Sequence, residues 1–182
     1  MPLREKDAMK KNTGFTLIEL IVTVAIAAIV MAIGIPSFRE TINQNQLTTY
    51  SNQFIGSLNL ARSEAIKRGS RVTLCPSSSG TNCEKIGYEN GWIIFNDQNS
   101  NAQVNGEAIV RIYEKMPEGM TLTGNANVET YVSYWGDGAS RLNGSPGGFQ
   151  SGTLTLCKNG KARKIILSSP GRLRVESDLT CP

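Results

Sequence analysis

The stretch KKNTGFTLIELIVTVAIAAIVMAIGIP, residues 10–36, decides the fold because it contains one long apolar run. From residue 15 to residue 35 only three residues are polar, namely Thr16, Glu19 and Thr23. As a helix this run would be about 32 Å long, which is enough to cross the ~30 Å hydrocarbon core of a bilayer. We therefore predict one membrane-spanning helix near the N-terminus.

The residues on each side of the run give its orientation. Lys10 and Lys11 precede it, and a basic flank of this kind remains cytoplasmic. Everything after Pro36 should then lie on the outer side of the membrane. Pro36 lacks a backbone N–H, so we expect it to kink or divide the long helix. A signal peptide would have a shorter apolar stretch followed by a cleavage site, whereas this run leads into more helical sequence.

Glu19 is the unusual residue of the run, because a charge at membrane depth costs several kcal/mol by insertion scales, roughly 3. Such a residue usually marks a function or a partner. The alternative is that Glu19, four residues into the run, reaches the interface from near the helix end.

Residues 14–20, GFTLIEL, resemble the processing motif of type IV pilins and type II secretion pseudopilins. The resemblance implies that a prepilin peptidase cuts between Gly14 and Phe15 and methylates the new N-terminus of Phe15. It also implies that Glu19 neutralises the N-terminal ammonium of a neighbouring subunit during assembly, a pair that is favourable only when both partners are present. The leader would be residues 1–14, or a shorter one if translation begins at Met9.

After Pro36 the apolar residues continue with helical spacing. From Leu47 to Ala65 they recur every three or four residues, which predicts an amphipathic helix whose apolar face packs on a domain. Gly69 is a plausible stop. We therefore expect residues 15–36 to form the transmembrane and assembly helix and residues 37–69 to form its amphipathic half.

Residues 70–182 have the character of strands and turns. Eight short runs rich in Val, Ile, Thr and aromatic residues are separated by Gly, Asn, Pro and Ser: RVTLC, GWIIFND, AIVRIYE, MTLTG, ETYVSYW, GTLTLCKNG, ARKIILSS and GRLRV. Asn159–Gly160 between two of them predicts a hairpin. The expected fold is α+β: a long N-terminal helix packed on an antiparallel β-sheet domain, as in type IV pilins.

Four cysteines, all beyond the apolar run, suggest two disulfides in an exported chain. We predict the local pairing, Cys75–Cys83 with Cys157–Cys181, because each bridge then closes a short stretch; a zinc site is disfavoured because no CxxC pair occurs. The chain has no histidine, and nothing arranges its Ser, Asp and Glu residues for catalysis. We expect no enzyme activity, metal or cofactor, and a polar turn rather than a calcium loop at residues 97–101.

Three further stretches sharpen the resemblance: residues 60–75 (LARSEAIKRGSRVTLC), 91–97 (GWIIFND) and 168–175 (SSPGRLRV) look like the GspH/FimT/FimU group of minor pilins. The resemblance implies a low-abundance subunit that primes assembly at the filament tip. Its partners would be other minor and major pilins, the prepilin peptidase and the inner-membrane assembly platform. It would reside in the bacterial inner membrane and then in the pilus. The alternative is a minor pseudopilin of type II secretion.

A basic segment, residues 157–175, contains six cationic residues and no acid: Lys158, Lys161, Arg163, Lys164, Arg172 and Arg174. In an extended strand Arg172 and Arg174 would project to one face, with Leu173 and Val175 on the other, and each guanidinium can grip a phosphate. Residues 171–174, GRLR, match the GRxR motif with which FimT-type pilins bind DNA in natural transformation. The resemblance implies phosphate-led, sequence-independent binding of double-stranded DNA. The alternative is a solvated edge strand or a pilin contact.

Overall fold

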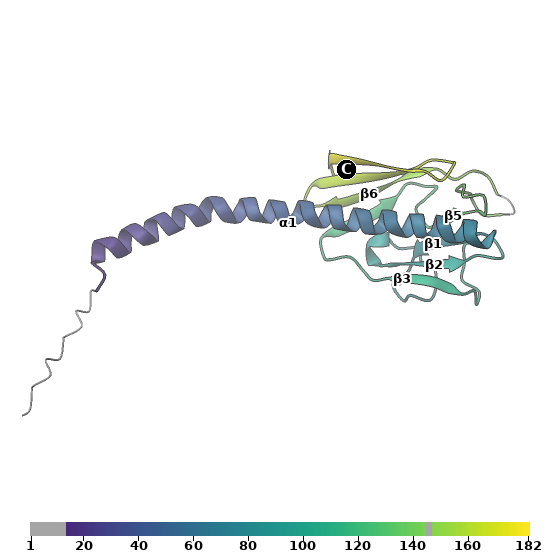
Figure 1. The fold of residues 1–182 in the computed structure, drawn as a ribbon, viewed down its shortest axis with the longest axis horizontal. Coiled ribbons are helices and arrows are strands. Elements are labelled where there is room, and N and C mark those ends of the chain that lie inside the picture. The colour runs from purple at the N-terminus through teal and green to yellow at the C-terminus, as the bar shows by residue number, and fades with distance from the viewer. Residues whose placement is uncertain (1–13, 145–146) are drawn as a thin grey trace, which may run out of the picture. The chain divides into compact units, whose positions relative to one another are not determined.

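The computed structural model describes residues 14–144 and 147–182, and over these it shows one long helix followed by eight strands (Figure 1). In chain order the elements are α1 (Leu17–Arg68), β1 (Val72–Pro76), the short 3-10 helix η1 (Tyr88–Asn90), β2 (Trp92–Asn96), β3 (Ile109–Tyr113), β4 (Met120–Gly124), β5 (Val132–Tyr134), β6 (Gly152–Lys158), β7 (Lys161–Leu167) and β8 (Leu173–Thr180). The chain forms two compact units that meet between Ile42 and Asn43. The expected α+β fold is confirmed.

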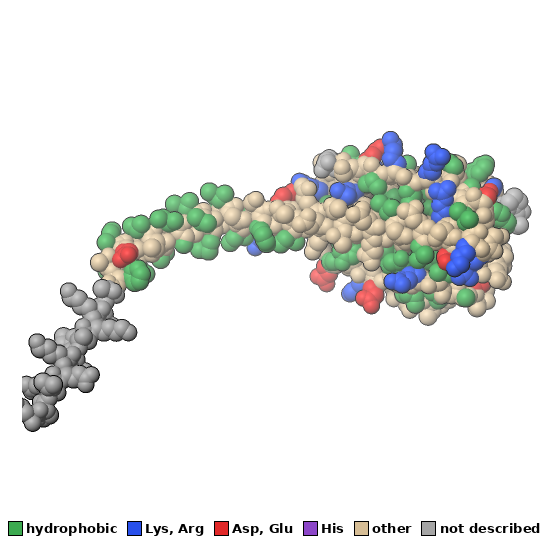
Figure 2. Space-filling view, in the orientation of Figure 1, with side chains coloured by type: hydrophobic (Ala, Val, Ile, Leu, Met, Phe, Trp, Pro, Cys, Tyr) green, Lys and Arg blue, Asp and Glu red, His purple; other side chains and the backbone are tan. Residues whose placement is uncertain are grey.

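The first unit, as far as the structure describes it, is the beginning of α1. This helix is long and apolar enough to cross a membrane, and its most apolar stretch has no buried residue. Figure 2 shows the apolar side chains along this part of the helix. The helix is not divided at Pro36, although the proline ring removes the N–H that would bond the carbonyl of Ala32.

In the second unit α1 buries one face and then stops as expected. Its buried residues recur at helical spacing: Leu47, Ser51, Phe54, Ser57, Leu58, Ala61 and Ala65. After Arg68, the Ser70 N–H donates to the carbonyl of Ala65 and the Gly69 N–H donates to that of Ile66, both at 3.3 Å. These two bonds satisfy carbonyls that a helix end would otherwise leave unpaired.

The strands form two antiparallel sheets of four, with the orders β3-β2-β1-β5 and β4-β6-β7-β8. In the second sheet the Asn159–Gly160 turn joins β6 to β7 directly, and Lys158 pairs with Lys161 across it. Both turn residues have positive φ, 48° and 78°, as a two-residue hairpin requires. The hairpin expected from Asn159–Gly160 is therefore present.

One apolar core joins the helix to both sheets. Phe54 of α1 meets Tyr88 and Trp92 edge to face, with ring centroids 5.2 Å apart in each case. Trp92 in turn stacks on Tyr113 at 4.9 Å. Trp92 is fully buried, whereas Trp135 is half-buried, and its ring lies 5.3 Å from the guanidinium carbon of Arg71.

A smaller cluster lies on the other face of the first sheet, around Cys75, Ile93 and Phe95. The structure joins Cys75 to Cys83 there, with 5.5 Å between the Cα atoms, and it joins Cys157 to Cys181, with 5.7 Å. The first bridge closes the loop after β1, and the second ties the end of β8 to β6. Because β1 and β2 are covered on both faces, every residue in these two strands is buried.

Candidate functional site

Three regions carry the residues that the sequence analysis selected: the start of α1, the basic segment, and the turn that begins the GRLR stretch. At the start of α1, Phe15 and Glu19 are both exposed, Phe15 by 82 %. Gly14 is the first described residue and has open space around its Cα, so the rest of the leader, residues 1–13, lies outside the described part.

Glu19 also has a local role that sequence reasoning missed. The hydroxyl of Thr16 accepts the backbone N–H of Glu19 at 3.3 Å, and α1 begins at the residue after Thr16. Thr16 and Glu19 thus occupy the two positions of a capping box, in which a carboxylate also suits the positive end of the helix dipole. The signal was present in the sequence as T-x-x-E.

The basic segment is not one continuous surface, because the register of the sheet separates its members. Lys158 and Arg163 lie on the face that includes buried Leu156, and the Lys158 ammonium donates to the side-chain carbonyl of Gln46 on α1. Lys164 lies on the opposite face, opposite Thr155. The cations of β6 and β7 are therefore divided between the helix side and the outer side of the sheet.

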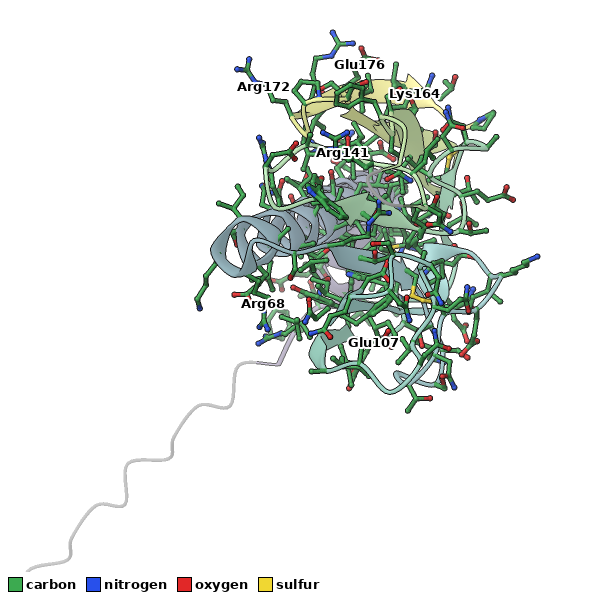
Figure 3. The ribbon with its side chains drawn as sticks, turned by 90° about the vertical axis from the view of Figure 1, so that its right-hand side faces the viewer. Arg68, Glu107, Arg141, Lys164, Arg172 and Glu176 are labelled. Carbon is green, nitrogen blue, oxygen red and sulfur yellow. A yellow bond between two sulfur atoms is a disulfide. The ribbon has the colours of Figure 1, made fainter. Side chains whose placement is uncertain are left out.

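Arg174 shares the outer face with Lys164 and has its own acidic neighbour. Its register partner on β7 is Ile166, and the partner of Lys164 on β8 is Glu176. The Arg174 guanidinium lies 2.8 Å from the Glu176 carboxylate, although 71 % of the Arg174 side chain is exposed. Figure 3 shows Lys164, Glu176 and Arg172 along the same edge of the domain. A shallow groove of about 440 Å³ is lined by three threonines, Thr123, Thr153 and Thr155, and by Lys164 and Glu176 among others.

Arg172 precedes β8 and belongs to a tight turn, residues 168–172. The Ser168 N–H and hydroxyl both donate to the Arg172 carbonyl at 3.0 Å, and the Gly171 N–H donates to the Ser168 carbonyl at 2.7 Å. Leu173 is half-buried against the core, whereas Arg172 is exposed and points away from the domain (Figure 3). The turn therefore fixes the backbone of Arg172 and leaves its guanidinium in solvent.

Arg62 of α1 holds this turn from the helix side. Its two terminal nitrogens donate to the carbonyls of Gly171, at 3.1 Å, and Pro170, at 3.2 Å. Gly171 has φ +79°, and a Cβ there would lie 2.3 Å from the carbonyl oxygen of Gly138. The glycine of the GRLR stretch is thus needed for packing, independently of any ligand.

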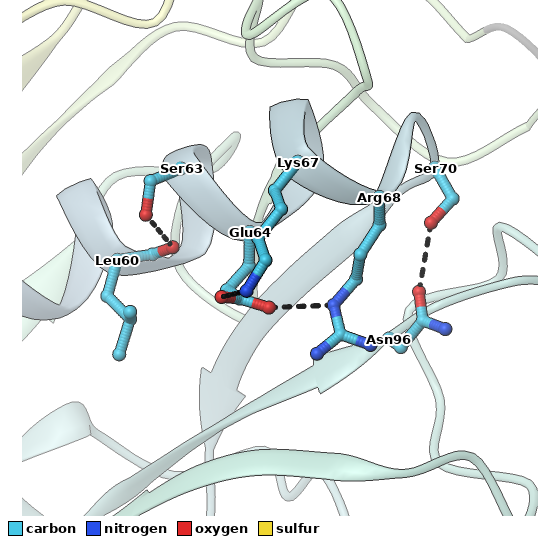
Figure 4. Close-up of polar contacts among 7 residues, drawn as sticks. All are labelled: Leu60, Ser63, Glu64, Lys67, Arg68, Ser70 and Asn96. Atoms are coloured by element: carbon cyan, nitrogen blue, oxygen red, sulfur yellow. Dashed lines mark hydrogen bonds and ion pairs between the residues drawn. The ribbon is translucent and has the colours of Figure 1, made fainter.

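The end of α1 carries a second group of charges (Figure 4). Glu64 accepts from the Arg68 guanidinium at 2.7 Å and lies 3.8 Å from the Lys67 ammonium. The hydrogen bond from Arg68 lowers the pKa of Glu64 below its usual value. These exposed pairs follow helical spacing and favour the helix end only slightly.

Residues 97–101 form the polar turn expected in place of a calcium loop, but with one buried carboxylate. Asp97 is fully buried, and its oxygens accept the Thr73 hydroxyl at 2.8 Å and the N–H groups of Asn101 and Ala102 at 3.1 Å. Both oxygens of the Asp97 carboxylate are thus paired with protein donors. Within residues 14–144 and 147–182 no three His, Cys, Asp or Glu residues are grouped to hold a metal ion.

Comparison with known proteins agrees with this architecture. Residues 51–171 match the family described as type II transport protein GspH, and residues 9–35 match the prokaryotic N-terminal methylation motif. A fimbrial protein of Pseudomonas aeruginosa is 31 % identical over 96 residues, which cover 53 % of this chain and 61 % of that protein. The pilin-like protein PilA1 of Thermus thermophilus is 27 % identical over 171 residues, 90 % of this chain and 97 % of its own.

The fold resembles that of the type IV minor pilin FimU of Pseudomonas aeruginosa, with a TM-score of 0.57 and 19 % identity over 76 % of this chain and 97 % of that one. This likeness concerns the fold alone. The methylation motif extends into the apolar helix as far as residue 35, and the GspH match covers residues 51–171, from the buried part of α1 to the turn before β8. The chain belongs to the GspH family of minor type IV pilins and pseudopilins.

Proposed function

We propose that this protein is a minor type IV pilin that is anchored in the bacterial inner membrane and then enters the filament, where it helps to initiate or cap assembly. One observation carries the proposal. Glu19 is exposed on an apolar helix whose most apolar stretch buries nothing within the chain. Such a carboxylate is costly in lipid and is compensated in a polymer, where it can meet a neighbour's N-terminal ammonium.

The residues before Glu19 support the same proposal, because they are accessible for processing by a prepilin peptidase. Gly14 and Phe15 are exposed, so a prepilin peptidase could reach the bond between them. Cleavage there would make Phe15 the N-terminus, two residues before α1 begins and four residues before Glu19. The partners in processing and assembly would be the prepilin peptidase, the inner-membrane assembly platform, and other minor and major pilins.

The test compares Glu19→Val with Thr23→Val in the full-length chain. The Thr23 hydroxyl bonds to carbonyls of its own helix, Glu19 and Leu20, both at 2.9 Å, so its removal takes away a polar group with no need of a partner. Both variants should insert in the membrane, and only Glu19→Val should be depleted from purified filaments. Wild-type incorporation of Glu19→Val would refute the assembly role.

The alternative is a minor pseudopilin of type II secretion, which would use the same helix and the same carboxylate. The matching family is described as a type II transport protein, and the N-terminal methylation motif does not distinguish the two alternatives. Deletion of the gene separates them: loss of surface pili with normal secretion supports the pilin, and loss of secretion with normal pili supports the pseudopilin.

A second candidate function is binding of double-stranded DNA without sequence preference, as in uptake during natural transformation. The observation that favours it is Arg172, exposed on a turn that is held at both of its ends. Arg174 and Lys164 would extend the contact along the outer face, whereas Lys158, Lys161 and Arg163 would contribute less from the helix side. The full-length protein in detergent should bind unrelated duplexes alike, and Arg172→Gln should reduce the salt slope by about one unit. If the wild type and Arg172→Gln bound DNA with the same affinity and the same salt dependence, Arg172 would have no role in DNA binding.

A further inference from the structure

Phe149 is an exposed aromatic residue on a fixed backbone. Its side chain is 60 % exposed, yet it forms a backbone bridge with Arg141, and the next residue, Gln150, is fully buried. The Gln150 amide side chain donates to the carbonyls of Asn127 and Tyr131 at 2.7 Å and 3.0 Å. The position of the ring is therefore set by a buried anchor one residue away.

A cation lies against the ring. The guanidinium carbon of Arg141 is 4.7 Å from the Phe149 centroid, and only 18 % of the Arg141 side chain is exposed. Asp137 holds the guanidinium at 2.8 Å, and the hydrogen bond from Arg141 lowers the pKa of Asp137, so the pair stays charged at neutral pH. Arg141 covers part of the ring, restricts its orientation and leaves the rest in solvent.

Ser140 connects this ring to the turn that carries Arg172. The Ser140 hydroxyl lies 2.6 Å from the Gln150 carbonyl and 3.1 Å from that of Ser168, and its N–H donates to the carbonyl of Ser169 at 3.2 Å. Ser140 is fully buried, so both segments are fixed to one interior residue. Figure 3 views the domain from this end, with Arg172 at the rim and Arg141 nearer the centre.

We propose that Phe149 and Arg172 form one contact site for single-stranded nucleic acid, in which a base stacks on the exposed ring and the guanidinium holds a phosphate. The proposal rests on the DNA-binding role above and adds a preference for unpaired bases. Aromatic rings are the usual platforms for single strands, because every base has a face that can stack. In a duplex the base faces are already covered by their neighbours, so an isolated ring gains nothing there.

The sequence hides this arrangement, since no aromatic residue lies within the basic segment. Phe149 lies outside that segment, and the contacts of Ser140 connect its neighbour Gln150 to the turn that carries Arg172. The Phe149 ring and the exposed Arg172 guanidinium, on two segments that Ser140 connects, are the two kinds of group that a nucleotide requires, one for the base and one for the phosphate.

The experiment measures binding of the full-length protein in detergent to three labelled probes: oligothymidylate, an abasic strand of the same length, and a mixed-sequence duplex. Phe149→Ala should weaken binding of oligothymidylate by about tenfold and leave the other two probes unchanged. Phe149→Trp should retain the affinity, because a larger ring also stacks. Ile112→Ala is the matched control, since Ile112 is 54 % exposed on β3 of the other sheet.

The possible results distinguish base stacking by Phe149 from the other roles that its ring could have. Retained binding in Phe149→Trp, with loss confined to oligothymidylate in Phe149→Ala, supports stacking and shows that the domain is folded. Equal affinity of wild type and Phe149→Ala for oligothymidylate overturns stacking, while a defect in Arg172→Gln would leave the DNA-binding role intact. If the wild-type protein binds none of the probes, both proposals fail. Loss of filament incorporation in Phe149→Ala with unchanged nucleic-acid binding would make the ring a protein contact instead.

Discussion

Arg62 and Gly171 are 109 residues apart in the sequence, and the guanidinium of the first donates to the carbonyl of the second at 3.1 Å. The helix thereby holds the turn of the GRLR stretch directly, in addition to packing on the sheets. Hydrogen bonds from charged groups contribute roughly 1.5–3 kcal/mol when they are well formed.

Arg62→Gln should therefore destabilise the domain by about 2 kcal/mol and loosen the turn of residues 168–172. Urea unfolding and amide exchange at Gly171 would measure the two effects. Arg68→Gln is the control, because the Arg68 guanidinium pairs with Glu64 at the exposed helix end that Figure 4 shows, and its loss should have little effect on stability. If the amide of Gly171 exchanged at the same rate in Arg62→Gln as in the wild type, the hydrogen bonds of Arg62 would not be what holds the turn.

Gly171→Ala should be more harmful than Gly160→Ala. Both glycines have nearly the same positive φ, +79° and +78°, but a Cβ at Gly171 would meet the Gly138 carbonyl, whereas Gly160 has open space. The backbone strain, about 1 kcal/mol, is common to both, and the clash should add about 2 kcal/mol at Gly171. Unfolding midpoints would show the difference, and equal midpoints would mean that the turn moves away from Gly138 at little cost.

Processing should depend on Gly14. Gly14→Leu should leave the chain uncleaved, because the motif that the peptidase reads ends at this residue. Immunoblotting of membranes would then show only the longer form, while Thr23→Val, farther along the helix, should be processed normally. A mature-sized band from Gly14→Leu would place the cleavage site elsewhere.

Non-reduced peptides should contain Cys75 linked to Cys83 and Cys157 linked to Cys181, as the structure pairs them. Replacement of both Cys157 and Cys181 by Ser should cost about 3 kcal/mol by loop closure and release the end of β8 from β6. Mass spectrometry and unfolding curves would measure these two results. A peptide joining Cys75 to Cys157 would overturn the pairing.

The stability of the domain should fall on acidification partly through Asp137. Because Arg141 lowers the pKa of Asp137 in the folded state, this pair stabilises the protein above the ordinary pKa of Asp, about 3.9. The contribution is lost as the pH falls through the lower folded value. Asp137→Asn should lower the free energy of unfolding by about 0.5 kcal/mol at neutral pH and should not change it in strong acid. Urea unfolding at several pH values would measure this. A constant difference at all pH values would exclude the ion pair as its cause.

The elements of the fold follow closely from the sequence, because each is bounded by residues with a clear backbone effect. All eight apolar runs contain strands, α1 ends at Arg68, and Asn159–Gly160 makes the hairpin. The division of the eight strands into two sheets could not be predicted from the sequence. β1 and β2 are buried on both faces, so their sequences lack the alternation that would reveal which neighbours they have.

The arrangement of the candidate sites was harder to predict, since it depends on register and on loops. Four of the six cations lie on β6 and β7 and fall on two faces of the sheet, because side chains alternate along these strands. Phe149 lies in a loop with no periodicity, so nothing in the sequence placed it near the Arg172 turn. Glu19 is the exception: both its capping partner and its unusual cost could be read from residues 16–19.

The shared core of α1 and the two sheets has a mechanical consequence. In Figure 1 the strands of the second unit run roughly along the helix, and Phe54 ties that helix to Tyr88 and Trp92. A pull along the helix would load the inter-strand bonds in shear, many at once, because antiparallel bonds lie across the strand direction. A pull across β8 would instead break them in succession. Force spectroscopy should find the domain stronger along the helix than across β8, as the filament role proposed above would require.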